Sequence, residues 1–204
     1  SNVSRSSACS RATVECMVPS QQSPQSRQSE DVEVEGLVTW RSPVQYHRVA
    51  GETGPIARLS ADQLGAIGLT GSDDTIPTLR GTLEQVAGRV PILIEVKSRW
   101  DSRIAAICLA VRRELEGYRG PHAVMSFDPR VARWFADHSP ATVRGLVVTE
   151  ENSRPLTGLV RRHMALWHAR PDFLAYDIRD LPSGFAAAQR ARGLPVTTWT
   201  VRSP

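Results

Sequence analysis

From residue 91 onward, short apolar runs alternate regularly with longer amphipathic segments. Period-2 alternation and β-branched residues predict strands that begin at residues 91, 123, 145, 173 and 195. Apolar residues at i, i+3 and i+4 predict the helices between them, over about 102–117, 129–138, 156–167 and 183–192. The strand starts are 22 to 32 residues apart. This βα repeat is typical of both doubly wound sheets and (β/α)₈ barrels.

The chain upstream of this repeat has a different pattern. Residues 1–30 contain nine serines and four glutamines, a composition that buries too little apolar surface to offset its ordering entropy. Within it, 14–18 forms one strand-like island, and 31–47 predicts at most a weak strand or hairpin. Two short helices are expected further on, over 60–67 and 79–88, the second capped by Thr78. We therefore expect a poorly ordered segment over 1–47 and a folded α/β portion over 48–204.

The strand near residue 95 carries the first candidate chemistry. Side-chain alternation places Ile92, Ile94 and Val96 on one face, and Glu95 and Lys97 on the other. Burying these two charges is costly unless they pair with each other or meet a metal or a substrate anion. A purely structural ion pair at a strand end is the alternative interpretation.

Further polar and aromatic residues follow the other predicted strands. The carboxyl ends of parallel strands meet at one edge of the sheet, where the chemistry of such folds is found. The residues at these ends are Ser126, Phe127, Thr149, Glu150, Asp177 and Trp199. Together with Glu95 and Lys97 they suit a divalent cation and a phosphate. Asp177 is expected to act as a loop or cap carboxylate, and Glu150 and Glu151 to lie in a solvated loop.

Charge and composition narrow the class of protein. The net charge of the 204-residue chain is +4, and its arginines are scattered rather than gathered into the basic stripe of a nucleic-acid-binding protein. No stretch approaches 18 apolar residues, so no membrane span is expected. The three cysteines have no metal-site spacing, and the cytoplasm is the default expectation for a chain without a signal-peptide core. A doubly wound nucleotide-binding domain is disfavoured because no glycine-rich loop follows any predicted strand.

Four short motifs, in order and at plausible spacing, carry a resemblance to a known family. They are Ile76–Leu79 (IPTL), Ile94–Lys97 (IEVK), Ser126–Phe127 and Thr198–Val201 (TWTV). With the upstream loop Arg48–Gly54 and the segment Leu59–Leu64, the sequence over 48–204 resembles the glycerophosphodiester phosphodiesterases.

This resemblance implies a fold and an activity. The family has a (β/α)₈ TIM barrel that hydrolyses small-molecule glycerophosphodiesters to glycerol 3-phosphate and an alcohol, with Mg²⁺ or Ca²⁺ as cofactor. By position, Glu95 matches a metal carboxylate, Lys97 a catalytic, phosphate-binding lysine, and Trp199 the substrate-binding aromatic of the last strand. Ser126, beside Phe127 in the matching motif, is a further substrate-binding candidate.

The departures from the family pattern lie upstream. No His-Arg-Gly motif occurs, and the expected His-Asp would fall near residues 42–43, which are Ser-Pro. Glu15 resembles the first ligand of the expected Glu-x-Asp pair, but Met17 stands where the Asp would bind metal. We therefore expect an incomplete copy, lacking first strands and last helix, whose hydrolysis is impaired or absent. A shifted reading frame over 1–47 would explain the loss, and a non-catalytic barrel remnant or binding module is the alternative function.

Overall fold

The computed structural model describes residues 13–17, 63, 65–69, 71, 73–98, 104–150 and 155–199. The weak strand or hairpin expected over 31–47 lies outside these residues, as does half of the helix expected over 60–67. Of that helix, residues 63 and 65 are helical, whereas 66 and 67 are not, so the helix ends earlier than expected.

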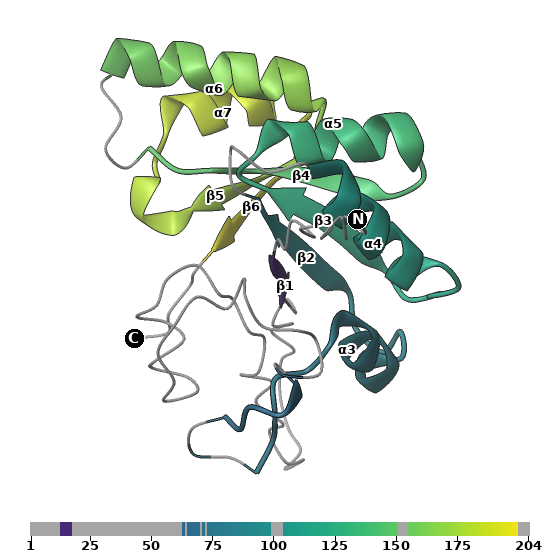
Figure 1. Cartoon of the computed structure of the whole chain (residues 1–204). Helices are drawn as coiled ribbons and strands as arrows, with labels where there is room; N and C mark the ends of the chain where they lie inside the picture. Colours follow the sequence, from purple (N-terminus) through teal and green to yellow (C-terminus); the bar gives the residue numbers. More distant parts are fainter. Residues whose placement is uncertain are drawn as a thin grey trace, which may run out of the picture.

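One six-stranded sheet forms the centre of the described structure, in the spatial order β1-β2-β3-β4-β5-β6 (Figure 1). The strands are β1 (Thr13–Met17), β2 (Ile92–Lys97), β3 (His122–Ser126), β4 (Val143–Val148), β5 (Phe173–Asp177) and β6 (Val196–Trp199). Strands β2 to β6 are parallel neighbours in chain order. The five strands predicted from the apolar runs are therefore confirmed, with ends that differ by a few residues.

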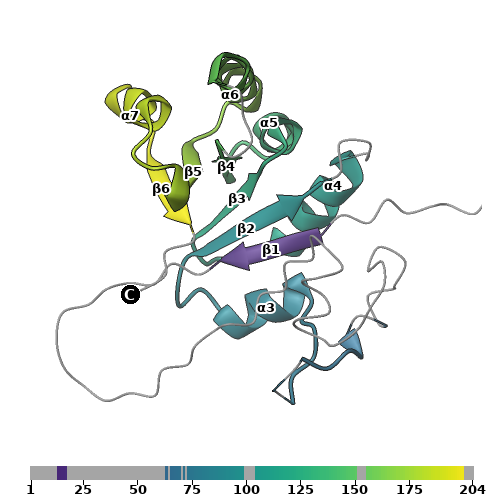
Figure 2. The same cartoon turned by 90° about the vertical axis from the view of Figure 1, so that its left-hand side faces the viewer.

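Helices connect the parallel strands and lie on one side of the sheet, which curves beneath them (Figure 2). They are α4 (Ile104–Leu115), α5 (Pro129–His138), α6 (Pro155–Ala169) and α7 (Gly184–Ala191), with a short 3-10 helix, η2 (Ile178–Asp180), before α7. Helix α3 (Leu79–Val86) precedes β2 and contacts α4. This repeating βα order is that of a partial (β/α) barrel. None of the described helices combines the length and apolar character that crossing a membrane requires.

Local capping explains where several helices begin. The Thr78 hydroxyl accepts a hydrogen bond of 3.0 Å from the backbone N–H of Gly81, which confirms the cap expected before α3. Ser183 caps α7 by accepting from Ala186 N–H at 3.2 Å. Asp128 caps α5, in which Pro129 occupies the first turn, where its missing N–H is not needed.

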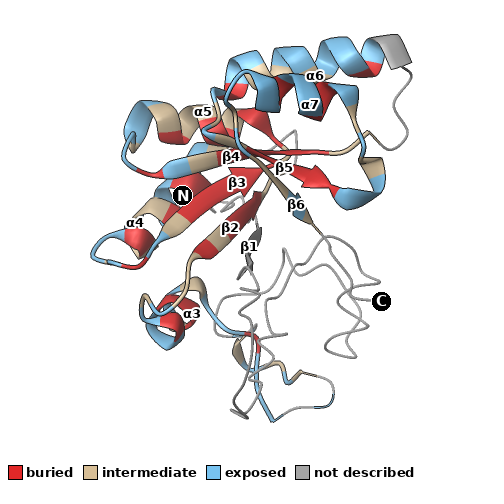
Figure 3. Ribbon diagram, turned by 180° about the vertical axis from the view of Figure 1, so that it is seen from behind, coloured by how far each residue is buried: buried red, intermediate tan, exposed pale blue. Residues whose placement is uncertain are grey.

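The main core lies between the sheet and the helices (Figure 3). From β2, Ile92, Ile94 and Val96 have no exposed surface and pack with α4 and α5, in the alternation that the sequence predicts. From α5, Phe135 is fully buried in the same cluster. Tyr176 is fully buried in the neighbouring cluster, between β5 and α7. One face of each parallel strand thus packs against the helices.

The other face of the sheet carries a smaller apolar cluster. Its buried members are Met125 on β3, Val147 on β4 and Ala175 on β5. Partly buried apolar side chains packed against it are Leu93, Phe127, Phe173 and Trp199. Because Leu93 alternates with Ile92 and Ile94, this cluster lies on the face that corresponds to the interior of a barrel.

Strand β1 differs from the barrel pattern. It pairs antiparallel with β2, whereas all eight strands of a (β/α)₈ barrel are parallel. The segment 14–18 was expected to be strand-like, and this is confirmed, but its direction is not that of a strand in a parallel barrel. An antiparallel pair needs no crossover helix and has slightly stronger hydrogen-bond pairing per residue than a parallel one, which allows a five-residue segment to join the sheet edge.

Replacing Phe135 by Ala should lower the free energy of unfolding by about 3–5 kcal/mol, because a buried aromatic side chain is lost and a cavity remains. Leu109→Ala on α4, where the side chain is 37% exposed, should change it by no more than about 1 kcal/mol. Urea denaturation of the two variants and the unmodified chain checks this. Equal losses for both variants would show that α5 does not pack on the sheet as described.

Candidate functional site

Glu95 and Lys97 extend from β2 on the face opposite the helices. Lys97 Nζ lies 3.8 Å from Glu95 Oε1, and the two side chains are only 15% and 9% exposed. Their fully buried neighbours Ile94 and Val96 fix the alternation that turns them to this face. The structure therefore contains a nearly buried ion pair at the carboxyl end of a central strand. Because desolvation of such a pair is costly, it is weak evidence for a stabilising role.

Two aromatic rings lie on the same face, at the ends of strands further along the sheet. Phe127 follows β3 and Trp199 ends β6, and their rings meet edge to face with centroids 5.8 Å apart. Both pack on the cluster formed by Met125, Val147 and Ala175. The Trp199 Nε1–H is buried and meets no acceptor among the described residues. This arrangement gives one apolar wall with an indole donor, on the face that carries the ion pair.

Ser126 is not part of this group. Its side chain is 1% exposed and donates a hydrogen bond of 2.6 Å to the carbonyl oxygen of Val96. Its oxygen also accepts from the backbone N–H of Asp128 at 3.1 Å. Alternation along β3 places Ser126 on the helix-covered face with Val124, away from Lys97. The structure thus gives this hydroxyl the role of tying the ends of β2 and β3 together.

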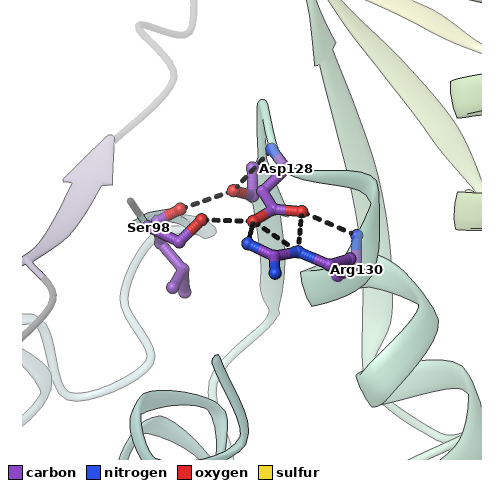
Figure 4. Close-up of polar contacts among 5 residues, drawn as sticks. Ser98, Asp128 and Arg130 are labelled. Atoms are coloured by element: carbon purple, nitrogen blue, oxygen red, sulfur yellow. Dashed lines mark hydrogen bonds and ion pairs between the residues drawn. The ribbon is translucent and has the colours of Figure 1, made fainter. Parts of the chain in front are cut away.

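Asp128 is the centre of a polar network that the sequence reasoning missed (Figure 4). Its carboxylate accepts from Ser98 Oγ at 2.5 Å, from Arg130 N–H at 3.0 Å and from Arg130 Nη2 at 2.7 Å. Burial alone would raise the pKa of Asp128, but the hydrogen bonds from Arg130 and Ser98 outweigh it and lower the pKa below its usual value. Since Ser98 follows Lys97, this network anchors the end of β2 directly beside the candidate site.

Asp177 repeats the same device at the end of β5. It is 2% exposed, caps η2 by accepting from Arg179 N–H at 2.9 Å, and pairs with Arg179 Nη2 at 2.5 Å. The hydrogen bonds of the Arg179 side chain lower the pKa of Asp177, against the opposing effect of burial. The expectation that Asp177 acts as a cap carboxylate is therefore confirmed.

Glu150 belongs to a network, not to a solvated loop, so that expectation is wrong. Its carboxylate accepts from Ser183 Oγ at 2.6 Å and from the Tyr176 hydroxyl, and it lies 3.5 Å from Arg162 Nη2. Asp180 accepts from Thr149 Oγ1 at 2.9 Å and from Glu150 N–H at 2.6 Å. Burial would raise the pKa of Glu150, but the bonds from Ser183 and Tyr176 lower it. Glu151 lies outside the described residues.

The carboxylates at these strand ends are candidates for holding the expected Mg²⁺ or Ca²⁺. Mg²⁺ and Ca²⁺ take six to eight oxygen ligands. Within the described residues, no three His, Cys, Asp or Glu side chains are grouped as a metal site. Asp128, Glu150, Asp177 and Asp180 are all engaged by arginines, hydroxyls or backbone N–H groups. The β1–β2 register places the backbone of Glu15 opposite Glu95, but the described residues alone do not form a complete divalent-cation site.

A concavity of about 540 Å³ lies at the other end of the sheet, near the loops that precede β2 and β3. It is lined mainly by α3, the end of α4 and the turns that follow them, including Arg80, Gly88, Glu114 and Gly120. Arg80 Nε and Glu114 Oε2 form an ion pair of 3.1 Å across it. Because barrel chemistry lies at the carboxyl ends of the strands, this concavity is separate from the candidate site.

Asp128→Asn should lower the free energy of unfolding at pH 7 by about 1–3 kcal/mol, because the variant keeps the shape but loses the charge that Arg130 and Ser98 bind. The folded pKa is lowered, so the stabilisation is present above the ordinary Asp pKa of about 3.9 and is lost as the pH falls through the folded value. Urea denaturation at neutral and at strongly acidic pH measures whether the free energies of unfolding of the variant and the unmodified chain converge as the pH falls. A difference that stays constant down to the acid end would contradict the assignment of the lowered pKa to this network.

The sequence matches no protein-family model and no curated protein. Solved structures do match. A phosphodiesterase of Oleispira antarctica, determined in complex with the product sn-glycerol-3-phosphate, aligns with a TM-score of 0.62 and 18% identity, over 76% of this chain and 64% of that one. A glycerophosphodiester phosphodiesterase from Parabacteroides distasonis aligns with a TM-score of 0.59 and 18% identity, over 78% and 64% of the two chains.

A third neighbour, a glycerophosphodiester phosphodiesterase from Agrobacterium tumefaciens, aligns with a TM-score of 0.51 and 18% identity, over 76% of this chain and 65% of that one. The present chain thus spans slightly less than two thirds of the length of these neighbours. The TIM-barrel prediction is confirmed for the portion that aligns. Over that portion, the chain has the fold of the glycerophosphodiester phosphodiesterases.

Proposed function

We propose that this chain is glycerophosphodiester phosphodiesterase-like and binds the phosphate of a small-molecule glycerophosphodiester through Lys97, which Glu95 positions. The observation that carries the proposal is the nearly buried Glu95–Lys97 pair on the barrel-interior face at a strand carboxyl end. An ion pair that is costly to bury there is consistent with a ligand that shares the charge. The barrel fold shared with phosphodiesterases supports the choice of phosphate as that ligand.

Each residue has a distinct role in this proposal. The Lys97 ammonium is a compact point charge that can donate to phosphate oxygens, and Glu95 holds it in place before the ligand binds. Phe127 and Trp199 provide the apolar wall on which the carbon atoms of the glycerol or alcohol moiety pack. The Trp199 Nε1–H, buried and without an acceptor among the described residues, is suited to donate to a ligand hydroxyl.

Hydrolysis by this chain is proposed to be impaired or absent. The family resemblance implies two histidines that act as general acid and base, one in a His-Arg-Gly motif and one in a His-Asp motif. Neither motif occurs in this sequence. The cofactor, Mg²⁺ or Ca²⁺, is a further prediction from the resemblance, with Glu95 and Glu15 as its carboxylate ligands. The described residues contain no group of three His, Cys, Asp or Glu side chains that could hold such a cation, so we assign it no step.

Binding can be tested without activity because Lys97 is the only lysine of the chain. Glycerol 3-phosphate should protect Lys97 from an amine-reactive reagent, measured by mass spectrometry of the peptide that contains it. Lys97→Met should lower the affinity for glycerol 3-phosphate in calorimetry by about tenfold or more, since a charge-assisted bond to phosphate is lost. The control Arg190→Ala removes an exposed cation on α7 and should leave affinity unchanged. If saturating glycerol 3-phosphate leaves the labelling rate of Lys97 unaltered, the proposed site is wrong.

Turnover is measured separately, as release of glycerol 3-phosphate from glycerophosphocholine with Mg²⁺ or Ca²⁺ and an EDTA control. We expect binding with little or no turnover, which is the behaviour of a non-catalytic binding module on a barrel scaffold. Robust metal-dependent turnover would contradict the proposal that hydrolysis is impaired. If Glu95→Gln and Glu15→Gln each abolished that turnover, the result would support these two residues as metal ligands. Turnover that is insensitive to both substitutions and to EDTA would contradict the assignment of Glu95 and Glu15 to the metal.

A further inference from the structure

An apolar ridge runs along the outer side of α6. Val160, Met164 and Trp167 are 58%, 65% and 79% exposed. Spacings of four and three residues place the three side chains in line on one side of the helix. The opposite side of α6 faces the protein, where Ala169 is fully buried and Arg162 pairs with Glu150. Figure 3 shows the outer side of α6 as exposed surface at the periphery of the molecule.

The ridge is flanked by basic side chains, and the sequence of α6 itself contains no acidic residue. From residue 155 to residue 170 the sequence contains no Asp or Glu, while Arg161, His163, His168 and Arg170 are exposed. Helical geometry places Arg161 and His168 along one flank of the ridge and His163 along the other, while Arg170 follows the end of the helix.

Helix α7 extends this basic surface. It packs beside α6, since the Phe185 ring contacts the His163 ring at 5.1 Å and lies under the Arg162 guanidinium at 5.6 Å (Figures 1 and 2). It contains no acidic residue and contributes exposed Arg190, which the exposed Arg192 follows. On α5, Asp137 is already paired with Arg133 at 2.9 Å. The α6–α7 surface therefore presents an apolar ridge within a field of positive charge.

We propose that α6 docks this chain onto the surface of a lipid bilayer that contains anionic lipids. An exposed Trp and Met on a helix with basic flanks is the pattern of helices that lie in the membrane interface. The apolar side chains enter the acyl boundary while the arginines reach the headgroup phosphates. A second copy of the chain fits less well, because a ridge-to-ridge contact would bring basic flanks together with no carboxylate to neutralise them. This inference does not depend on the function proposed above.

The test is flotation of the full-length chain with two kinds of vesicle, phosphatidylcholine alone and phosphatidylcholine mixed with phosphatidylglycerol in equal parts. Binding should be confined to the anionic vesicles and should weaken as salt is raised, because the headgroup attraction is screened. Met164→Ser combined with Trp167→Ser should lower the partition coefficient by about tenfold or more, since two large apolar side chains no longer enter the interface. Leu109→Ser, an exposed apolar residue on α4, is the matched control and should bind like the unmodified chain.

A charge variant separates the electrostatic contribution to membrane binding from that of the apolar ridge. Arg161→Glu combined with Arg190→Glu should weaken binding to the anionic vesicles several-fold, whereas Arg119→Glu, an exposed arginine in the turn after α4, should not. None of the exchanged side chains belongs to the described core clusters, and circular dichroism of each variant checks that it is folded. Absence of binding to anionic vesicles, or equal binding by the ridge variant and the control, would overturn the proposal. So would a dimer, seen by analytical ultracentrifugation, that the ridge variant abolishes while vesicle binding persists.

Discussion

The division of each parallel strand into two faces is the constraint on which the rest of the structure depends. In β2, Ile92, Ile94 and Val96 are fully buried against the helices, and the residues between them must therefore turn the other way. Two of those residues are Glu95 and Lys97. A shift of the strand by one residue would bury both charges beneath α4 and expose three branched apolar side chains. The strong apolar face therefore fixes where the charges lie.

The ends of the strands are held by carboxylates that take no part in the candidate site. Asp128 and Asp177 each accept from the backbone N–H two residues later and from the side chain of the same arginine. Asp180 holds the turn after β4 in a similar way, through Thr149 and Glu150. In the first two networks the arginine and the backbone N–H supply donors to a carboxylate that would otherwise be buried without partners. These hydrogen bonds and ion pairs thus tie the strand ends to the turns and helices that follow them.

Much of this architecture could be predicted from the sequence because the signals are local. Apolar runs with period 2 between amphipathic segments gave the strands and helices from residue 91 onward, and the strong β2 pattern placed Glu95 and Lys97 correctly on one face. The direction of β1 could not be inferred, since a five-residue strand-like segment carries no information on whether it pairs parallel or antiparallel. The Asp128 network was missed although its signal is visible: Asp-Pro-Arg after a strand combines an N-cap, a proline at the first helical position and a nearby cation. The roles of Glu150 and Ser126 depend on contacts between residues about 30 positions apart, which no local pattern reveals.

The chain uses arginine and lysine differently. Of its 25 basic residues, 24 are arginines and one is Lys97. Arginines 130, 144, 162 and 179 pair with Asp128, Asp172, Glu150 and Asp177, where a planar guanidinium with several donors can hold a carboxylate in one orientation. Lys97 lies 3.8 Å from its carboxylate partner, a looser contact than the 2.5 to 2.7 Å pairs of Asp177 and Asp128. A compact ammonium on a flexible stem has no fixed fork of donors, whereas a guanidinium paired in this way cannot reorient without breaking several hydrogen bonds.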